Sequence, residues 1–146
     1  MSSRVVVLAS AAIASSLIST AAVAQWTVVN LHPPGAPLTS QALGGGGAQQ
    51  VGSVQTGATV GTIRASLWSG TSASWINLHP AGDYSFAYGS DGVQQVGAVF
   101  FGAPSHASLW SGSAASWVDL NPAGVSDSAA FGVEGGTQVG RALVLA

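Results

Sequence analysis

The chain lacks cysteine and lysine altogether and carries little charge of either sign. Its 146 residues include three basic and five acidic side chains, and all three basic ones are Arg. Without cysteine an exported protein has no disulfides, so its stability must come from packing and strand pairing. Without a basic patch to neutralise phosphates, the chain is not expected to bind nucleic acid.

The chain also lacks a long, uninterrupted apolar run. Its most apolar segment (5–18) is broken by serines and falls short of the ~20 apolar residues that a transmembrane anchor needs. Arg4 precedes this segment and Ala22-Val23-Ala24 follows it as a small-x-small cleavage site, the pattern of a secretory signal peptide. A membrane anchor is the less favoured interpretation. The sequence therefore predicts a signal peptide at 1–24 and a secreted mature chain, extracellular or periplasmic, at 25–146.

What the sequence does contain is an internal repeat. Residues 65–70 (Ala-Ser-Leu-Trp-Ser-Gly) return unchanged at 107–112, and Trp75–Gly82 returns in related form at Trp117–Gly124, both at an offset of 42 residues. A period of this length, built from short apolar runs and Gly, Ser and Pro turns, is typical of repeat arrays such as propellers.

Each period contains four short strand candidates. In the best-defined copy they are Ser85–Gly89, Gln94–Val99, the Ala-Ser-Leu-Trp run and the Trp-x-x-Leu run, with an Asp-Gly turn after the first. Asp-Gly between apolar runs is a strong hairpin signal because both residues tolerate positive φ. No amphipathic helical period is present. The sequence predicts an all-β domain of antiparallel four-stranded units, β-propeller-like, with units at 26–37 (partial), 38–82, 83–124 and 125–146 (partial).

The predicted strand count leaves the array incomplete. From Trp26 onward the order is one strand of the fourth type, two sets of four, and a first and second strand, which gives 11 candidates. Propellers typically close with about four to eight blades of four strands each. With under three blades, the chain is expected to be an open stack, a ring closed by oligomerisation, or a fragment of a longer array.

The repeat resembles a known family, the HAF-type extracellular repeat of secreted bacterial proteins. The residues that carry the resemblance are His106-Ala107-Ser108-Leu109-Trp110, Trp117-Val118-Asp119-Leu120, Ser128-x-Ala130-x-Gly132 and Gln138-Val139-Gly140. The chain departs from the family pattern at Ser108, where the family has an aromatic residue, and at Arg64, which replaces the His106 equivalent. The resemblance implies propeller-like β structure and export, and it implies no shared catalytic residue.

The repeat also predicts a core. Apolar residues at equivalent positions of the strand candidates are expected to be buried, and the Trp-Ser-Gly tryptophans are expected to pack between units. The predicted core residues are Leu67, Trp68, Leu78, Val96, Leu109, Trp110, Leu120 and Val139.

Few residues are candidates for binding chemistry. His32 and His79 precede Pro at the same repeat position, and Asn121 replaces them in the third copy. A metal site is disfavoured because no third His and no carboxylate occupies that position, so these residues are expected to satisfy backbone groups in a turn. No metal and no other cofactor is expected.

The second tryptophan row is the better candidate for a ligand surface. It comprises Trp26, Trp75 and Trp117. Packing inside the array competes here with an exposed aromatic platform for sugars or apolar polymers. Possible ligand contacts are therefore assigned to Trp26, His32, Trp75, His79 and Trp117.

Two classes of function follow from these observations. The first is a secreted, non-catalytic binding module for a glycan, the cell envelope or a protein surface. The second is a self-associating structural protein, because residues 25–146 carry two Arg against five acidic residues, a net charge of −3, and the predicted edges Trp26–Leu31 and Thr137–Ala146 have little charge to protect them. An enzyme is not expected, since propeller hydrolases need clustered Arg, Tyr and carboxylates.

Overall fold

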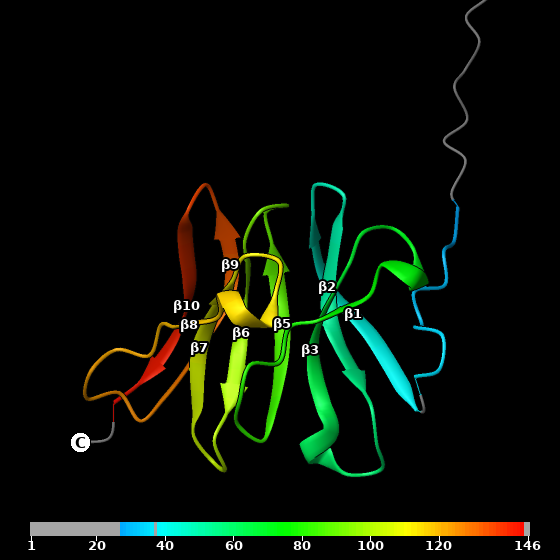
Figure 1. Cartoon of the computed structure of the whole chain (residues 1–146). Helices are drawn as coiled ribbons and strands as arrows, with labels where there is room; N and C mark the ends of the chain where they lie inside the picture. The colour runs from blue at the N-terminus through cyan, green and yellow to red at the C-terminus, as the bar shows by residue number, and fades with distance from the viewer. Residues whose placement is uncertain (1–26, 37, 145–146) are drawn as a thin grey trace, which may run out of the picture.

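The structure, a computed structural model, describes residues 27–36 and 38–144. Within these residues ten strands form three antiparallel sheets that stand side by side (Figure 1). The first sheet is β1 (Thr39–Gly46), β2 (Gln49–Gln55), β3 (Ile63–Trp68) and β4 (Ile76–Asn77); the second is β5 (Tyr84–Ser90), β6 (Gln95–Phe100), β7 (Ser105–Trp110) and β8 (Val118–Asp119); the third is β9 (Asp127–Glu134) and β10 (Thr137–Leu143). Short 3-10 turns lie at Val60–Thr62, Ser72–Ser74 and Ala114–Ser116.

The prediction of an all-β chain with antiparallel four-stranded units is confirmed, and the predicted count of eleven strands is wrong. The missing strand is the one expected at Trp26–Leu31: residues 27–33 form no strand, and Trp26, like the predicted signal peptide at 1–24, lies outside the described residues. Because residues 27–33 contain no strand, no sheet is formed ahead of β1 in the described chain. In the described chain the three sheets therefore form an open row, with β1 toward one end and β10 at the other (Figure 1).

Each sheet repeats the same irregularity in its first hairpin. The register between the first two strands shifts by one residue at Leu43, at Tyr88 and at Phe131. A β-bulge of this kind bends the strand and increases its twist. Opposite each bulge stands the glycine of a Gln-Val-Gly run, and a Cβ there would collide with a carbonyl oxygen of the neighbouring strand at Gln41, Phe86 or Ala129. The close approach of the two backbones therefore requires the glycine of this motif.

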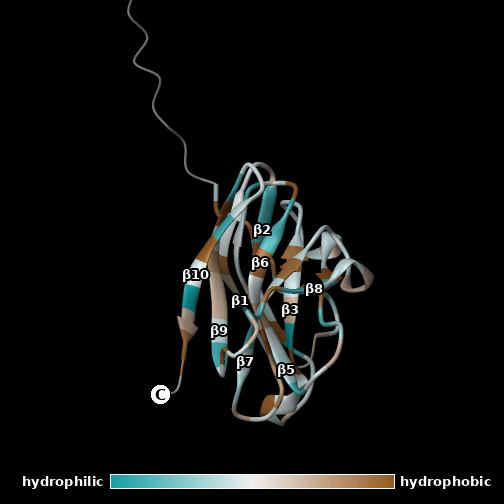
Figure 2. Ribbon diagram, turned by 90° about the vertical axis from the view of Figure 1, so that its left-hand side faces the viewer, coloured by the Kyte–Doolittle hydropathy of each residue, from teal (hydrophilic) through white to brown (hydrophobic). Residues whose placement is uncertain are grey.

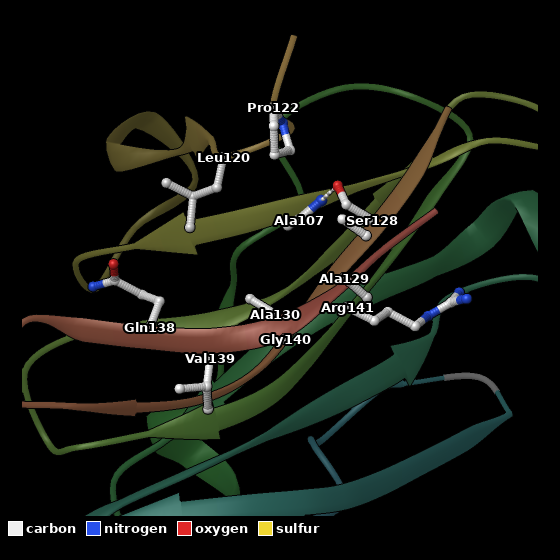
Figure 3. Close-up of a pocket in the computed structure, with 11 residues that line it drawn as sticks. Ala107, Leu120, Pro122, Ser128, Ala129, Ala130, Gln138, Val139, Gly140 and Arg141 are labelled. Atoms are coloured by element: carbon white, nitrogen blue, oxygen red, sulfur yellow. Dashed lines mark hydrogen bonds between the residues drawn. The ribbon is translucent and has the colours of Figure 1, made fainter. Parts of the chain in front are cut away.

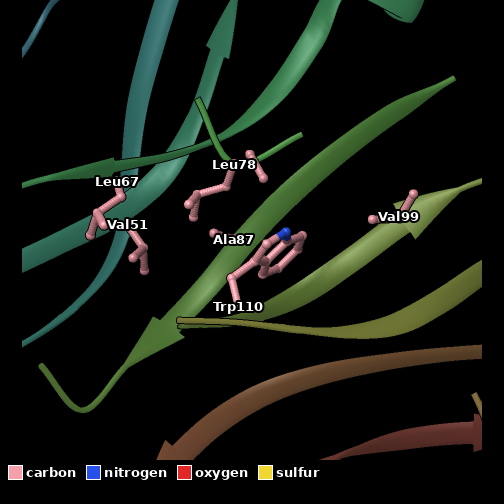
Figure 4. Close-up of a cluster of buried hydrophobic side chains, with 7 residues drawn as sticks. Val51, Leu67, Leu78, Ala87, Val99 and Trp110 are labelled. Atoms are coloured by element: carbon pink, nitrogen blue, oxygen red, sulfur yellow. The ribbon is translucent and has the colours of Figure 1, made fainter. Parts of the chain in front are cut away.

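The main core lies between the first and second sheets. Trp110 of β7 is fully buried against Leu67, Leu78 and Val51 of the first sheet, with Ala87 of β5 beside it (Figure 4). Burial of an aromatic side chain removes a large apolar area from water, which is the main driving force for packing the sheets together. The predicted interior positions of Trp68, Trp110, Leu67, Leu78 and Val96 are confirmed.

The second core, between the second and third sheets, is smaller. It consists of Val96, Ala107 and Ala130, with Leu109 and Leu120 only partly buried. Leu109 and Leu120, which are predicted to be buried, are therefore buried only in part. The prediction for Val139 is wrong, because this residue is 61 % exposed on β10. Each of these residues lacks a neighbour that its counterparts have, because the third sheet contains two strands in the described chain.

Candidate functional site

The predicted histidine positions form hydrogen-bonded links between sheets. The hydroxyl of Ser85, on β5, accepts the backbone N–H of Ala65 at 2.9 Å and lies 2.8 Å from Nδ1 of His79. One hydroxyl thus contacts the backbone of β3 and the ring of His79 at the same time. We call this three-residue contact the serine link. It joins β3 of the first sheet to β5 of the second.

The same link recurs with asparagine in place of histidine. The hydroxyl of Ser128 accepts the N–H of Ala107 at 2.9 Å and donates to Oδ1 of Asn121. The Asn121 amide then donates to the carbonyl of Val125 at 3.1 Å, as Nε2 of His32 contacts the carbonyl of Ala36 at 3.2 Å in the first copy. Asn thus offers the same acceptor and donor as a neutral His, which explains why the repeat accepts either residue.

This geometry assigns His79 a structural role as a neutral ring. Burial and, to a smaller extent, the nearby charge of Arg64 lower the pKa of His79 below its ordinary value. A neutral ring whose Nδ1 contacts the hydroxyl of Ser85 is a link in the fold. Across residues 27–36 and 38–144, no group of three or more His, Cys, Asp or Glu is placed to hold a metal ion.

The tryptophans proposed as a ligand platform are tied into their own sheets. The indole N–H of Trp75 donates to the hydroxyl of Ser66 at 2.9 Å, and that of Trp117 donates to Ser108 at 3.0 Å. Both rings are partly buried, and Trp117 packs against the main core. Trp26 lies outside the described residues. These contacts give Trp75 and Trp117 a role in holding their own sheets, and their assignment as ligand contacts stays a prediction.

Among the described residues, two carboxylates lie within ion-pair distance of a basic side chain. Nδ1 of His106 lies 2.7 Å from a carboxylate oxygen of Asp119, within the second sheet. Asp127 of β9 accepts hydrogen bonds from the N–H and the hydroxyl of Ser105 and pairs with Arg141 of β10 at 2.8 Å. These contacts with Ser105, and more weakly Arg141, lower the pKa of Asp127. The second pair fastens the third sheet to β7 and engages the one charged residue of β10.

A pocket that the repeat pattern did not predict lies beside β10, where the described chain has no third strand. It has a volume of about 280 Å³ and lies between the second sheet and β10. Leu120, Pro122 and Ala107 form one wall, and Gln138 of β10 belongs to the opposite one (Figure 3). Gln138 and Leu120 point into the space from opposite sides, whereas Val139 points to the other face of β10 (Figure 3). The lining side chains are apolar apart from the amide of Gln138, the hydroxyl of Ser128 and the guanidinium of Arg141.

Comparison with the first interface shows why this space exists. Val51, Ala65, Leu67, Leu78 and Ala87 of the main core have repeat equivalents in the smaller core, namely Val96, Ala107, Leu109, Leu120 and Ala130. The indole that covers them in the first interface comes from the third strand of the next sheet, at Trp110. The third sheet has no third strand in the described chain, so no indole covers Leu120. The pocket lies where that indole would be.

A second pocket lies at the opposite end of the row. It has a volume of about 240 Å³ and is lined in part by Leu31, His32, Ser40 and Trp68. Ser40 lies 3.0 Å from Nδ1 of His32, as in the serine link. In the described residues no sheet precedes β1 to supply the backbone N–H that completes the link. Both ends of the row therefore present half of an interface between sheets.

The length of the repeat and the lack of a third Ala-Ser-Leu-Trp run were the sequence signals for the pocket at β10.

A scan against protein-family models, a search of curated proteins and a search of solved structures each found no match to this chain. No helix among the described residues has the length and apolar character needed to cross a membrane.

Proposed function

We propose that this chain is an exported, non-catalytic β-repeat module that binds a partner through the open end of its row of sheets at β10. The observation that carries the proposal is the interrupted third sheet, which combines an apolar pocket with a strand edge. Export rests on the sequence of residues 1–24. The propeller-like architecture rests on the repeated sheets and on the resemblance to HAF-type repeats.

The chemistry of β10 supports this assignment. An edge strand presents N–H and C=O groups that no neighbouring strand satisfies, and natural proteins usually protect such edges with charge, Pro or a covering segment. The only charged residue of β10 is Arg141, which pairs with Asp127. Val139, Leu143 and Val144 are 61 %, 49 % and 67 % exposed. Viewed from this side, hydrophobic segments interrupt the hydrophilic ones along β10 (Figure 2). Such an edge favours binding of a partner.

A second candidate function is self-association into a structural polymer. It is favoured by the two half-interfaces at opposite ends of the row, because contact between unlike ends of successive molecules generates a filament. The low net charge of residues 25–146, two Arg against five acidic residues, offers little repulsion against such contacts.

The size of purified 25–146 in solution, measured by light scattering over a wide concentration range, separates the two functions. A binding module is expected to remain a discrete species and to retain ligands on a glycan array or on isolated envelope material. A structural protein is expected to grow with concentration. In either case the double substitution Val139→Lys and Leu143→Lys should abolish the interaction, since both residues are exposed on β10. Unchanged binding or growth in this variant would contradict a role for β10.

A further inference from the structure

We propose that the open end accepts an extended peptide segment that adds to β10 as the third strand of the third sheet and inserts a tryptophan into the pocket beside Leu120. The inference rests on the proposed function and names the partner chemistry: a polypeptide with a small-Ser-Leu-Trp-Ser-Gly pattern. The first two sheets already contain such a strand, at β3 and β7.

The two filled copies fix the register of the incoming strand. In the first sheet Gln50 stands opposite Trp68, and in the second sheet Gln95 stands opposite Trp110. The Gln-Val-Gly run of β10 begins at Gln138. The incoming strand is therefore antiparallel to β10, with its tryptophan opposite Gln138, its leucine opposite Val139 and its serine opposite Gly140.

The side of β10 that faces the second sheet is the one that receives the indole. Paired residues of neighbouring strands project to the same face of a sheet, and successive residues alternate. Gln138 lines the pocket and Val139 points away from it (Figure 3). A tryptophan opposite Gln138 therefore projects toward Leu120 and Ala107, as Trp110 covers Leu78 and Ala65 in the main core. Leu120 would become buried like its counterpart.

Gln138 already has the orientation that its counterparts use to hold the turn after this tryptophan. In Gln50, Gln95 and Gln138 the side-chain amide donates to the carbonyl two residues earlier. In the first two, Oε1 accepts the backbone N–H of the glycine in the Trp-Ser-Gly turn, at Gly70 and Gly112, both at 2.8 Å. No donor to Oε1 of Gln138 is found in the described part of the chain. This acceptor is available to the glycine of the incoming segment.

A second copy of the chain is a poor source of this strand. Its own two Ala-Ser-Leu-Trp segments are paired on both sides, β3 with β2 and β4 and β7 with β6 and β8. Their tryptophans are fully buried. To donate either segment, the second copy would have to take apart one of its own sheets. The occupant is therefore a segment that the described chain does not contain.

Fluorescence anisotropy of a labelled peptide tests the inference. The probe is the octapeptide Ser-His-Ala-Ser-Leu-Trp-Ser-Gly, copied from residues 105–112, with blocked ends, titrated with purified 25–146. We expect saturable binding that weakens at least about tenfold when the peptide carries Ala at its tryptophan. Gln138→Ala in the protein should also weaken binding, whereas Gln55→Ala, the same substitution at the far end of β2, should leave it unchanged because β2 is already paired with β3. Leu120→Ser removes the apolar wall, and thermal melts establish that each variant is folded.

The following outcomes would overturn the inference. Equal binding of the peptides with Trp and Ala, or equal binding by the protein and Gln138→Ala, would show that the contact does not use the pocket. A dimer of 25–146 that the peptide dissociates would make a second copy the occupant. Absence of peptide binding by a protein that still binds a glycan or polymerises through β10 would reject strand addition while leaving the proposed function intact. Absence of every interaction would reject both.

Discussion

The two interfaces between neighbouring sheets use the same repeated residues and differ in how well these residues are covered. Leu78 in the first interface is fully buried, whereas its counterpart Leu120 in the second is only partly buried. The difference arises from Trp110, which covers Leu78 and has no equivalent on the third sheet. Burial in this array is therefore a property of the next sheet along the chain more than of the residue itself.

The polar contacts between sheets, in contrast, are kept at both interfaces. The serine link is present at both interfaces, through His79 and Ser85 in the first and Asn121 and Ser128 in the second. Asp127 adds hydrogen bonds with Ser105 that tie the third sheet to β7. The half-built sheet is therefore held in place by its hydrogen bonds and by a small apolar core. This leaves its outer face and its edge available for another strand.

The largest expected effect that distinguishes the interfaces comes from leucine truncation. Leu78→Ala opens a cavity in a fully buried cluster and should lower the free energy of unfolding by about 2–5 kcal/mol. Leu120→Ala removes a side chain that already borders an open pocket, so its cost should be below about 2 kcal/mol. Urea denaturation of residues 25–146 and of each variant measures both. Equal losses would mean that the second interface is as tightly packed as the first.

The sequence was sufficient to predict the strands of the three sheets and the burial of residues in the main core, but not the exposure of Leu109, Leu120 and Val139. The 42-residue offset located β3, β4, β7 and β8, because the repeated apolar runs record the strands directly. The Gln-Val-Gly runs at 50–52, 95–97 and 138–140 are identical in sequence. Val51 and Val96 are nevertheless buried and Val139 is exposed. The local sequence cannot predict this difference in burial, because the burial of the valine depends on whether another sheet packs against its own.

The candidate site shows the same limit. The repeat position shared by His32, His79 and Asn121 was visible in the sequence, and a role in satisfying backbone groups was predicted for it. The partner serines, however, belong to the following sheet, so the serine link appeared only in three dimensions. The pocket was not predicted because it lies where a third strand would stand beside β10, and the described chain has no such strand. In the sequence, only the incomplete strand count indicated it.

A smaller effect is expected from the glutamines that face the third strands. Gln95 is fully buried, and its side chain binds Gly112, Gln49 and Val93. Gln95→Ala leaves the Gly112 N–H without its acceptor and should cost about 1–3 kcal/mol. Gln138→Ala removes the hydrogen bonds that its amide donates to Gln94 and Gly136 but leaves no backbone N–H of the described chain without an acceptor, so it should cost less than about 1 kcal/mol. Thermal melts of the two variants provide the test. A large loss for Gln138→Ala would show that its acceptor is already in use.

The smallest effect concerns the pH dependence of the serine link, which differs between the interfaces because one contains His79 and the other Asn121. Burial lowers the pKa of His79 in the folded chain below its ordinary value of 6.5. As the pH falls through 6.5, the unfolded chain therefore binds a proton before the folded chain does, so the stability contributed at higher pH is progressively lost. His79→Asn should cost less than about 1 kcal/mol at neutral pH, since Asn offers the same acceptor and donor. It should also reduce the fall in Tm between neutral and mildly acidic pH. The reciprocal change, Asn121→His, should add such a fall at the second interface. An unchanged pH profile in both variants would show that the proton-accepting nitrogen of the link does not govern stability.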